Sequence, residues 1–365
     1  MLPVLLALWV SRLRDKILPK KIENKRRLIK LLAKLAPKAG ARLVIEPEWG
    51  VVAQMIYKNG VIRSFLGYLF DLNNTASTGI STDKSHAKFF MKRLGYPVAE
   101  GETVFEDKWA EEMESNRKIS YAFKYAKRLG YPVIVKPNSK SQGFGVSLAS
   151  NKSELTASLR EIFKEEKVAI VERYLPGRDY RIVILDGEII SAYERVPLSV
   201  VGDGKNSILA LLQKKQKSKS FARRGIDIDF KDRRMKIKLK RAGFSFKTIP
   251  TKGQKIFLLD IANLSPGGEA MDVIDVIHPE FRRIAINLTR DMGLRFCGVD
   301  IMVTKGDISK NPRNSKSCSY YIIETNSSPG LIGHYAKTLA GQEKLVEGMY
   351  LKVLKALARG LGKKD

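Results

Sequence analysis

Two carboxylates and an amide in the last third of the chain have the spacing of a cation-binding site. Asp300 lies within the apolar segment 296–303, and Glu324 and Asn326 lie within segment 320–331. Both segments are short, rich in β-branched and aromatic residues and bounded by glycine or proline, which predicts strands. Side chains two residues apart in a strand share a face, so Glu324 and Asn326 point the same way. If the two strands pair as a hairpin, Asp300 lies near Glu324.

Carboxylate and amide oxygens are hard ligands of the kind that Mg²⁺ binds, and the ion completes its octahedron with water and substrate phosphates. The residues therefore predict a metal site formed by Asp300, Glu324 and Asn326. The alternative is a pair of core strands whose polar residues lie at the end of a sheet. The loop 327–330, with the sequence Ser-Ser-Pro-Gly, follows directly and favours the metal site.

A basic strand end followed by a glycine-rich turn indicates a place for a polyanion. Lys136 ends the predicted strand 131–136, and the turn 139–146 that follows contains Gly143 and Gly145. A glycine-rich turn between two strands can lay backbone N–H groups against phosphates. A plain hairpin turn explains the two glycines equally well, but Lys136 directly before the turn favours the polyanion.

The elements that must position these motifs are hairpins alternating with helices. Helices are predicted over 82–94, 121–129, 153–164, 207–214, 279–292 and 342–359, and strands or hairpins over 41–75, 131–136, 168–172 and 182–192. This order indicates an α+β fold rather than a parallel βαβ run. The charged segment 106–118 is expected to be solvated, and segment 214–247 shows little apolar periodicity.

Composition narrows the class of protein. A chain of 365 residues is long enough for two or three compact units, and 44% apolar residues exclude wholesale disorder. Two cysteines cannot form a disulfide framework, and no CxxC pattern suggests zinc. Three scattered histidines do not suggest a metal cluster. A reducing cytoplasm is the expected compartment.

The net charge of +28 is concentrated in two segments. Residues 1–40 carry eleven Lys or Arg against two acidic residues, and residues 205–247 carry fifteen against three. Localised positive charge attracts polyphosphate, an acidic polymer, nucleic acid or a lipid surface. Binding of single-stranded nucleic acid also needs aromatic side chains among the basic ones, and segment 205–247 has only four phenylalanines. This disfavours nucleic acid, and a solvated surface remains the alternative for this segment.

The first forty residues combine apolar and basic character. Met1–Val10 is too short to span a bilayer as a helix, and no small-residue cleavage site follows it. Leucines at helical spacing from Leu28 to Leu35 predict an amphipathic helix that ends near Pro37 and Gly40. This helix could make a peripheral contact with acidic lipid or pack on its own domain, and the second interpretation is favoured.

A further series of motifs follows in order along the chain. It consists of Arg195-Val-Pro197, Val200–Lys205, Arg224-Gly225, Ala262–Ala270, Asp272–Asp275, His278-Pro279 and Glu324–Leu331. With these motifs the chain resembles the ATP-grasp superfamily of ADP-forming carboxylate–amine ligases, and most specifically the ATP-grasp half of the cyanophycin synthetase family. Fused glutathione-synthesising ligases share parts of the pattern. The likeness extends from about residue 75 to about residue 335.

The resemblance implies an α+β ATP-grasp fold, in which two subdomains grip ATP. Residues 1–75 would form a basic helical segment and a small preceding unit. Residues 76–185 would form the N-terminal, lid subdomain, and residues 186–365 the C-terminal subdomain with the metal site. The cofactors implied are ATP and Mg²⁺, with two ions bridging the phosphates.

The resemblance also implies a role for each matching position. Lys84 and Lys136 would hold the phosphates of ATP, beneath a mobile loop that contains Ser141, Gly143 and Gly145. Glu172, Arg173, Tyr174 and Leu175 would line the adenine, and Asp179 would bind the ribose hydroxyls. Asp300, Glu324 and Asn326 would bind the two ions. Arg181, Arg195, Lys205 and Asn263 would lie nearer the acyl phosphate or the substrate.

The function implied is ATP-dependent ligation, through an acyl phosphate, of an amino acid or amine to an amino acid, peptide or acidic polymer. Lysines and Mg²⁺ would neutralise the repulsion between the attacking carboxylate and the γ-phosphate, and a glycine-rich lid would keep water from the acyl phosphate. The alternative is a non-catalytic nucleotide-binding protein whose basic surface anchors it to membrane or nucleic acid. The sequence is compatible with a homo-oligomer.

Two departures from the family pattern limit this expectation. The chain has no GxxxxGK[ST] motif for the second, Mur-ligase-like reaction of cyanophycin synthetases. Gly298 stands where D-alanine–D-alanine ligases place an arginine. A single ligation step is therefore predicted.

Overall fold

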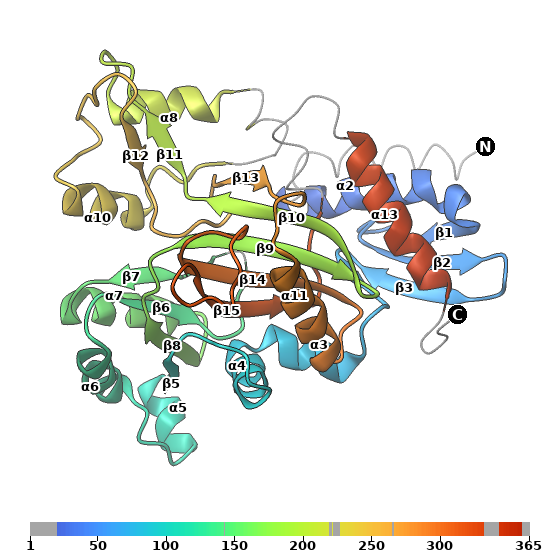
Figure 1. The fold of residues 1–365 in the computed structure, drawn as a ribbon, viewed down its shortest axis with the longest axis horizontal. Coiled ribbons are helices and arrows are strands. Elements are labelled where there is room, and N and C mark those ends of the chain that lie inside the picture. The colour runs from blue at the N-terminus through green and yellow to red at the C-terminus, as the bar shows by residue number, and fades with distance from the viewer. Residues whose placement is uncertain are drawn as a thin grey trace. The chain divides into compact units, whose positions relative to one another are not determined.

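The computed structural model describes residues 20–141, 143–218, 221, 227–264, 266–331 and 343–359, with side chains described from residue 27 onward (Figure 1). The chain divides into two compact units, one of residues 1–72, 330–332 and 341–365 and the other of residues 73–329 and 333–340. Two segments discussed in the sequence analysis lie outside the described residues: Met1–Val10 and Arg224-Gly225. The domain boundaries expected near residues 75 and 185 stay predictions.

The first unit combines an antiparallel sheet with helices from both ends of the chain. It contains α2 (Lys20–Leu35), the 3-10 helix η1 (Ala36–Ala39), β1 (Ala41–Ile45), β2 (Val52–Tyr57), β3 (Ile62–Leu66), β4 (Leu69–Phe70) and α13 (Glu343–Ala358). The strands are ordered β1-β2-β3-β4. Leu28, Leu32 and Leu35 of α2 are fully buried, and α2 packs on α13 and β1. The predicted amphipathic helix therefore packs on its own unit.

The last helix has the predicted apolar stripe in part. Met349, Val353 and Leu357 are buried, but Leu345 is 43% exposed. The prediction of a core position was wrong for Leu345, because this residue lies in the first turn of α13, at the end of the packed stripe.

The second unit is built on a five-stranded antiparallel sheet. Its order is β13 (Glu269–Asp272), β10 (Glu188–Val196), β9 (Arg178–Leu185), β14 (Phe296–Lys305) and β15 (Ser319–Asn326). Three helices pack on one face: α3 (Thr75–Thr82), α4 (Lys84–Arg93) and α11 (Pro279–Asp291). Alternate strand residues such as Ile182 and Val299 join Phe281 and Leu288 of α11 in the core between them. The residues in between, including Arg181 and Asp300, point to the opposite face.

A smaller sheet carries the glycine-rich turn (Figure 1, green). Its order is β5 (Gly101–Phe105), β8 (Val168–Arg173), β6 (Val133–Pro137) and β7 (Ser147–Ala149), packed with α6 (Ile119–Leu129) and α7 (Lys152–Ile162). Segment 106–118 is not simply solvated, as expected, but contains α5 (Asp107–Glu112). Glu106 caps this helix by accepting the N–H groups of Lys108 and Trp109, and Ala110 is fully buried.

The basic stretch folds into a module with its own core. This module contains β11 (Ser199–Val201), α8 (Ile208–Gln216), α10 (Arg233–Arg241) and β12 (Lys255–Phe257). Segment 214–247 lacks obvious apolar periodicity, yet α10 forms there, because Met235 and Leu239 one turn apart suffice to anchor it in the core. No helix in the described part of the chain is long and apolar enough to cross a membrane.

Candidate active site

β14 and β15 form the hairpin expected from the sequence. Their register places Asp300 opposite Glu324 and Gly298 opposite Asn326, which confirms the predicted proximity of the two carboxylates. β9 lies on the other side of β14 and places Arg181 beside Asp300. One face of the sheet thus presents two carboxylates and a guanidinium on three adjacent strands.

Two arginines and three carboxylates form one ion-pair network on this face. Arg181 binds Asp300 in a bidentate fork, with Nε 2.5 Å from Oδ1 and Nη2 2.7 Å from Oδ2, and its Nη2 lies 3.4 Å from Glu324 Oε1. Arg195 Nη2 lies 2.6 Å from Asp179 Oδ1 and 2.8 Å from Asp300 Oδ2. Asp179 was expected at the ribose, and the structure places it in this network.

Burial and charge act in opposite directions on the carboxyl groups of this network. Burial raises the pKa of Asp300, but the neighbouring charges of Arg181 and Arg195 outweigh it and hold this pKa below its usual range. Burial and the charge of Asp300 raise the pKa of Asp179, and Arg195 offsets them only in part. Asp300 is therefore the carboxylate held ionised.

A second ion-pair cluster lies in the smaller sheet. Glu172 Oε1 accepts a hydrogen bond from Lys136 Nζ at 2.6 Å, and Oε2 accepts one from Lys88 Nζ at 2.5 Å. Burial raises the pKa of Glu172, but the two ammonium groups outweigh it and bring this pKa to about 2. Sequence reasoning missed Lys88, although its position one turn after Lys84 on the same helix was an available signal.

Lys84 contacts the glycine-rich turn and senses the charges of both clusters. Its Nζ donates to the carbonyl oxygens of Asn138 at 3.2 Å and Lys140 at 2.6 Å, at the beginning of the glycine-rich turn. Burial lowers the pKa of Lys84, and the charge of Glu324 opposes this shift. The predicted phosphate lysine is thus close enough to Glu324 in the carboxylate network to sense its charge.

The glycine-rich turn contacts another predicted site residue. Gly143 has a φ of +73°, and a Cβ added to it would lie 1.7 Å from Asn263 Nδ2. A side chain at this position would force Asn263 to move and would strain the backbone, because this φ favours glycine. Ser141 lies in the same turn, where its carbonyl oxygen accepts the N–H of Phe144 at 3.2 Å. The structure therefore brings Asn263 and the turn together.

Other predicted residues lie further from these contacts. Lys205 lies in an exposed turn, and within the described residues nothing connects its side chain to the carboxylate network. Arg173 is exposed and pairs with Glu100 at 2.7 Å, and its backbone N–H donates to the carbonyl oxygen of Glu100 at 2.8 Å. Tyr174 and Leu175 are half-buried.

The oxygen atoms at the hairpin are of the kind that bind Mg²⁺, and both oxygens of Asp300 are held here by Arg181 and Arg195. Asp300, Glu324 and Asn326 supply oxygen ligands, although no group of three His, Cys, Asp or Glu side chains gathers within the described ranges. Arg195 Nε and Ser327 Oγ are buried without a hydrogen-bond partner in the part of the chain that is described. Buried polar atoms without partners are rare and suit a site that receives a polar ligand.

These features define an ATP-grasp protein: two antiparallel sheets, a glycine-rich turn with lysines beside it, and a carboxylate hairpin. Residues 90–236 match the family model described as D-ala D-ala ligase C-terminus, and residues 261–346 match the model described as RimK-like ATP-grasp domain. The chain belongs to the ATP-grasp superfamily, and the predicted α+β fold class is confirmed.

Similarity to particular proteins supports this assignment. The chain is 30% identical over 281 residues to the glutathione biosynthesis bifunctional protein GshAB of Enterococcus faecalis, covering 75% of this chain and 35% of the relative. It is 31% identical over 289 residues to cyanophycin synthetase of Trichormus variabilis, covering 77% of this chain and 30% of the relative. The chain thus spans about a third of the length of the curated relatives it matches.

A solved structure shares the fold. The bifunctional glutathione synthetase from Pasteurella multocida aligns with a TM-score of 0.54 and 24% identity, over 86% of this chain and 42% of that one. The predicted similarity to cyanophycin synthetase and to glutathione-synthesising ligases is confirmed.

Proposed function

We propose that this protein is an ATP- and Mg²⁺-dependent ligase that joins an amino acid or amine to a carboxylate substrate, with release of ADP and phosphate. The observation that carries the proposal is the pairing of Asp300 with Glu324 against Arg181, with Lys84 close enough to sense the charge of Glu324. The relatives named for glutathione biosynthesis and cyanophycin synthesis, and the family model named for D-ala D-ala ligase, favour catalysis over a non-catalytic anchor. ATP-grasp ligases use ATP and Mg²⁺, and two ions are proposed here.

The first step needs positive charge. A substrate carboxylate attacks the γ-phosphorus of ATP, a P–O bond forms, and the bond from the γ-phosphorus to the ADP oxygen breaks, which gives an acyl phosphate and ADP. Lys84 and Lys136 would hold the phosphates, and Asp300, Glu324 and Asn326 would hold Mg²⁺, which supplies further charge neutralisation when bound. Preorganised charges of this kind stabilise the developing negative charge of the transition state.

The second step forms the amide. The amine attacks the acyl carbon, the carbon–oxygen bond to phosphate breaks, and the nitrogen loses a proton to the departing phosphate. Arg181 is proposed to bind the acyl phosphate. Its side chain lies against Gly298, since a Cβ added to this glycine would be 3.4 Å from Arg181 Cδ. Arg181, from the neighbouring strand, thus lies against the position where D-alanine–D-alanine ligases place an arginine. Arg195, with its unpaired buried Nε, would bind beside it.

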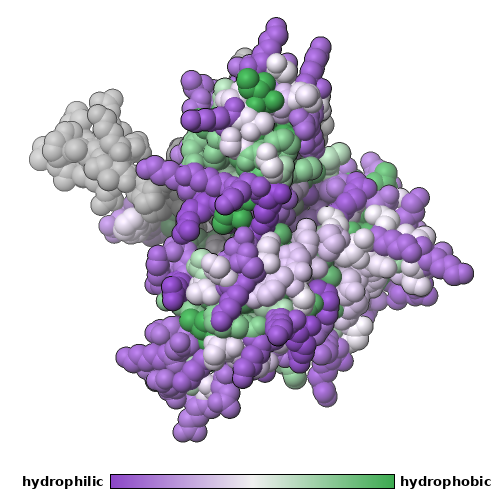
Figure 2. Space-filling model, turned by 90° about the vertical axis from the view of Figure 1, so that its left-hand side faces the viewer, coloured by the Kyte–Doolittle hydropathy of each residue, from purple (hydrophilic) through white to green (hydrophobic). Residues whose placement is uncertain are grey.

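The acceptor is proposed to be anionic, such as an acidic peptide or polymer. Four lysines in or directly after two helices of the basic module are exposed: Lys214, Lys217, Lys236 and Lys240. Figure 2, which faces the side of the molecule where α10 and β12 lie in Figure 1, shows a predominantly hydrophilic surface. Exposed charges are screened beyond about 10 Å at 0.1 M salt. The KM for an acidic acceptor should therefore rise with salt, and a constant KM would exclude this role.

The experiment that tests the function is ADP release with Mg-ATP and pairs of candidate substrates: single amino acids, acidic dipeptides and oligomers of glutamate or aspartate. Mass spectrometry identifies the product. Release that depends on one pair, with a product lighter than its two components by one water, would establish ligation. Failure of the protein to bind ATP would overturn the proposal.

A further inference from the structure

The helix α10 presents basic side chains on two different faces. Met235 and Leu239 lie in the core of the basic module. Arg233, Lys236 and Lys240 are exposed. Arg234, Lys238 and Arg241, spaced by one turn on a third face, all hold hydrogen bonds or ion pairs. Three of the basic side chains of this helix are therefore engaged in contacts within the protein.

Arg234 bonds to the glycine-rich turn. Its Nη1 donates to the carbonyl oxygens of Gly143 and Val146, both at 3.1 Å. These two carbonyl groups lie at the two ends of residues 143–146, the C-terminal half of the turn 139–146, and Asn263 lies against Gly143. One guanidinium from a distant part of the sequence thus holds the C-terminal half of the segment proposed to cover ATP.

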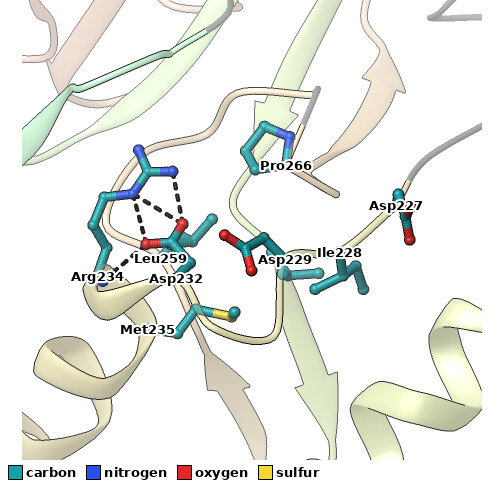
Figure 3. Close-up of a pocket in the computed structure, with 9 residues that line it drawn as sticks. Asp227, Ile228, Asp229, Asp232, Arg234, Met235, Leu259 and Pro266 are labelled. Carbon is teal, nitrogen blue, oxygen red and sulfur yellow. Dashed lines mark hydrogen bonds and ion pairs between the residues drawn. The ribbon is translucent and has the colours of Figure 1, made fainter. Parts of the chain in front are cut away.

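The orientation of Arg234 is set by Asp232. The Asp232 carboxylate accepts hydrogen bonds from Arg234 Nε at 3.0 Å and from Arg234 Nη2 at 2.7 Å. It also caps α10 by accepting a hydrogen bond from the backbone N–H of Arg234 at 2.9 Å. Figure 3 shows this fork among the residues that line a pocket. The pocket has a volume of about 130 Å³ and is also lined by Ile228, Met235 and Leu259. Because the pair is partly shielded from water, its hydrogen bonds are stronger than those of an exposed pair.

The other end of α10 is attached to the same small sheet. Arg241 Nη2 donates to the carbonyl oxygen of Leu148 on β7 at 2.8 Å and pairs with Glu154 of α7. Its Nη1 lies 3.2 Å from Asp260, which also pairs with Lys238 at 2.6 Å. The helix is therefore bound at two points to the subdomain that carries the turn, and its position is coupled to that of the turn.

We propose that α10 is a latch for the glycine-rich turn and that Arg234 is a positioning residue, which holds Gly143–Val146 in the conformation that covers the nucleotide. The consequence for catalysis rests on the proposed ligase function. A loosened turn would bind ATP less tightly and would admit water to the acyl phosphate, which would then hydrolyse to the substrate carboxylate and phosphate without forming an amide.

The decisive variant is Arg234→Lys, which keeps the charge but loses the planar fork. Its matched control is Arg233→Lys, one residue along the same helix on the exposed face. Hydrogen exchange in nucleotide-free protein should be about tenfold faster at the amides of residues 144 and 146 in Arg234→Lys, because local opening sets the exchange rate. The control should exchange as the wild type does. Equal exchange in both variants would overturn the latch, whatever the activity.

Turnover provides the second readout. In Arg234→Lys the KM for ATP should rise more than kcat falls, and the ratio of phosphate released to amide formed should increase from near one. Arg233→Lys should keep the wild-type ratio. If wild-type protein releases no ADP with any substrate pair, the proposed function fails, and the exchange experiment still decides on the latch. If the wild type is active and the ratio does not change in Arg234→Lys, the catalytic role of the latch is refuted.

Discussion

The buried carboxylate of Glu172 allows a prediction with a magnitude. Its oxygens accept hydrogen bonds from Lys136 Nζ at 2.6 Å and from Lys88 Nζ at 2.5 Å, and the three side chains are only 5 to 12% exposed. Replacing Glu172 by glutamine keeps the shape but leaves two buried ammonium groups without a counter-charge. Removing one partner of a buried ion pair costs about 3–5 kcal/mol. We expect a loss of this size in the free energy of unfolding at pH 7.

The pKa of the carboxyl supports the same magnitude. A fall of this pKa from 4.5 to about 2 on folding corresponds to about 3 kcal/mol. Because the folded-state pKa is lower, the stabilisation is fully present above pH 4.5 and is lost as the pH falls toward 2. The difference in stability between wild type and variant should therefore be constant at neutral pH and should narrow below about pH 4.5.

Urea unfolding followed by tryptophan fluorescence, at several pH values between 7 and 3, measures both effects. The control is Glu161→Gln on α7, whose ion pair with Lys164 is 66 to 69% exposed and should contribute no more than about 1 kcal/mol. A loss below about 1 kcal/mol in Glu172→Gln, or a difference that does not change with pH, would refute the reasoning.

Three further predictions concern turnover. Glu324→Gln should abolish ADP release without altering thermal unfolding, because the substitution weakens metal binding at a partly exposed position with little change in volume. Gly143→Ala should raise the KM for ATP at least about tenfold, because the added Cβ would collide with Asn263 and a positive φ disfavours alanine. Arg181→Lys should lower kcat by about a hundredfold, because lysine cannot keep the bidentate contact with Asp300 that would hold the guanidinium at the proposed acyl-phosphate position.

Each of these predictions has its own control or contrary result. ADP release at the wild-type rate in Glu324→Gln would remove that residue from the mechanism. Gly60→Ala tests the effect of backbone strain alone, because Gly60 has a φ of +82° and a Cβ there would meet nothing within 4 Å. If Arg181→Lys retains kcat but unfolds more easily, the arginine serves only the fold.

Local patterns in the sequence were sufficient for much of the fold. The pairing of Asp300 with Glu324 was predictable because their strands are neighbours in sequence, and the alternation of side chains determines which residues share a face. The helix α2 was predictable for a similar reason, since leucines one turn apart must be buried together. In α10 only Met235 and Leu239 carry the same signal among basic residues, so the helix was missed.

The sequence by itself thus determined the fold class, the family and the hairpin that carries the proposed metal ligands. Only the tertiary structure decided what surrounds that hairpin. The order β10-β9-β14 brings Arg195 and Arg181 to Asp300, and the packing of α10 brings Arg234 to Gly143, 91 residues away in sequence. Contacts of this range depend on strand order and on the docking of separate modules, which arise from the packing of the whole chain and leave no local periodicity to detect.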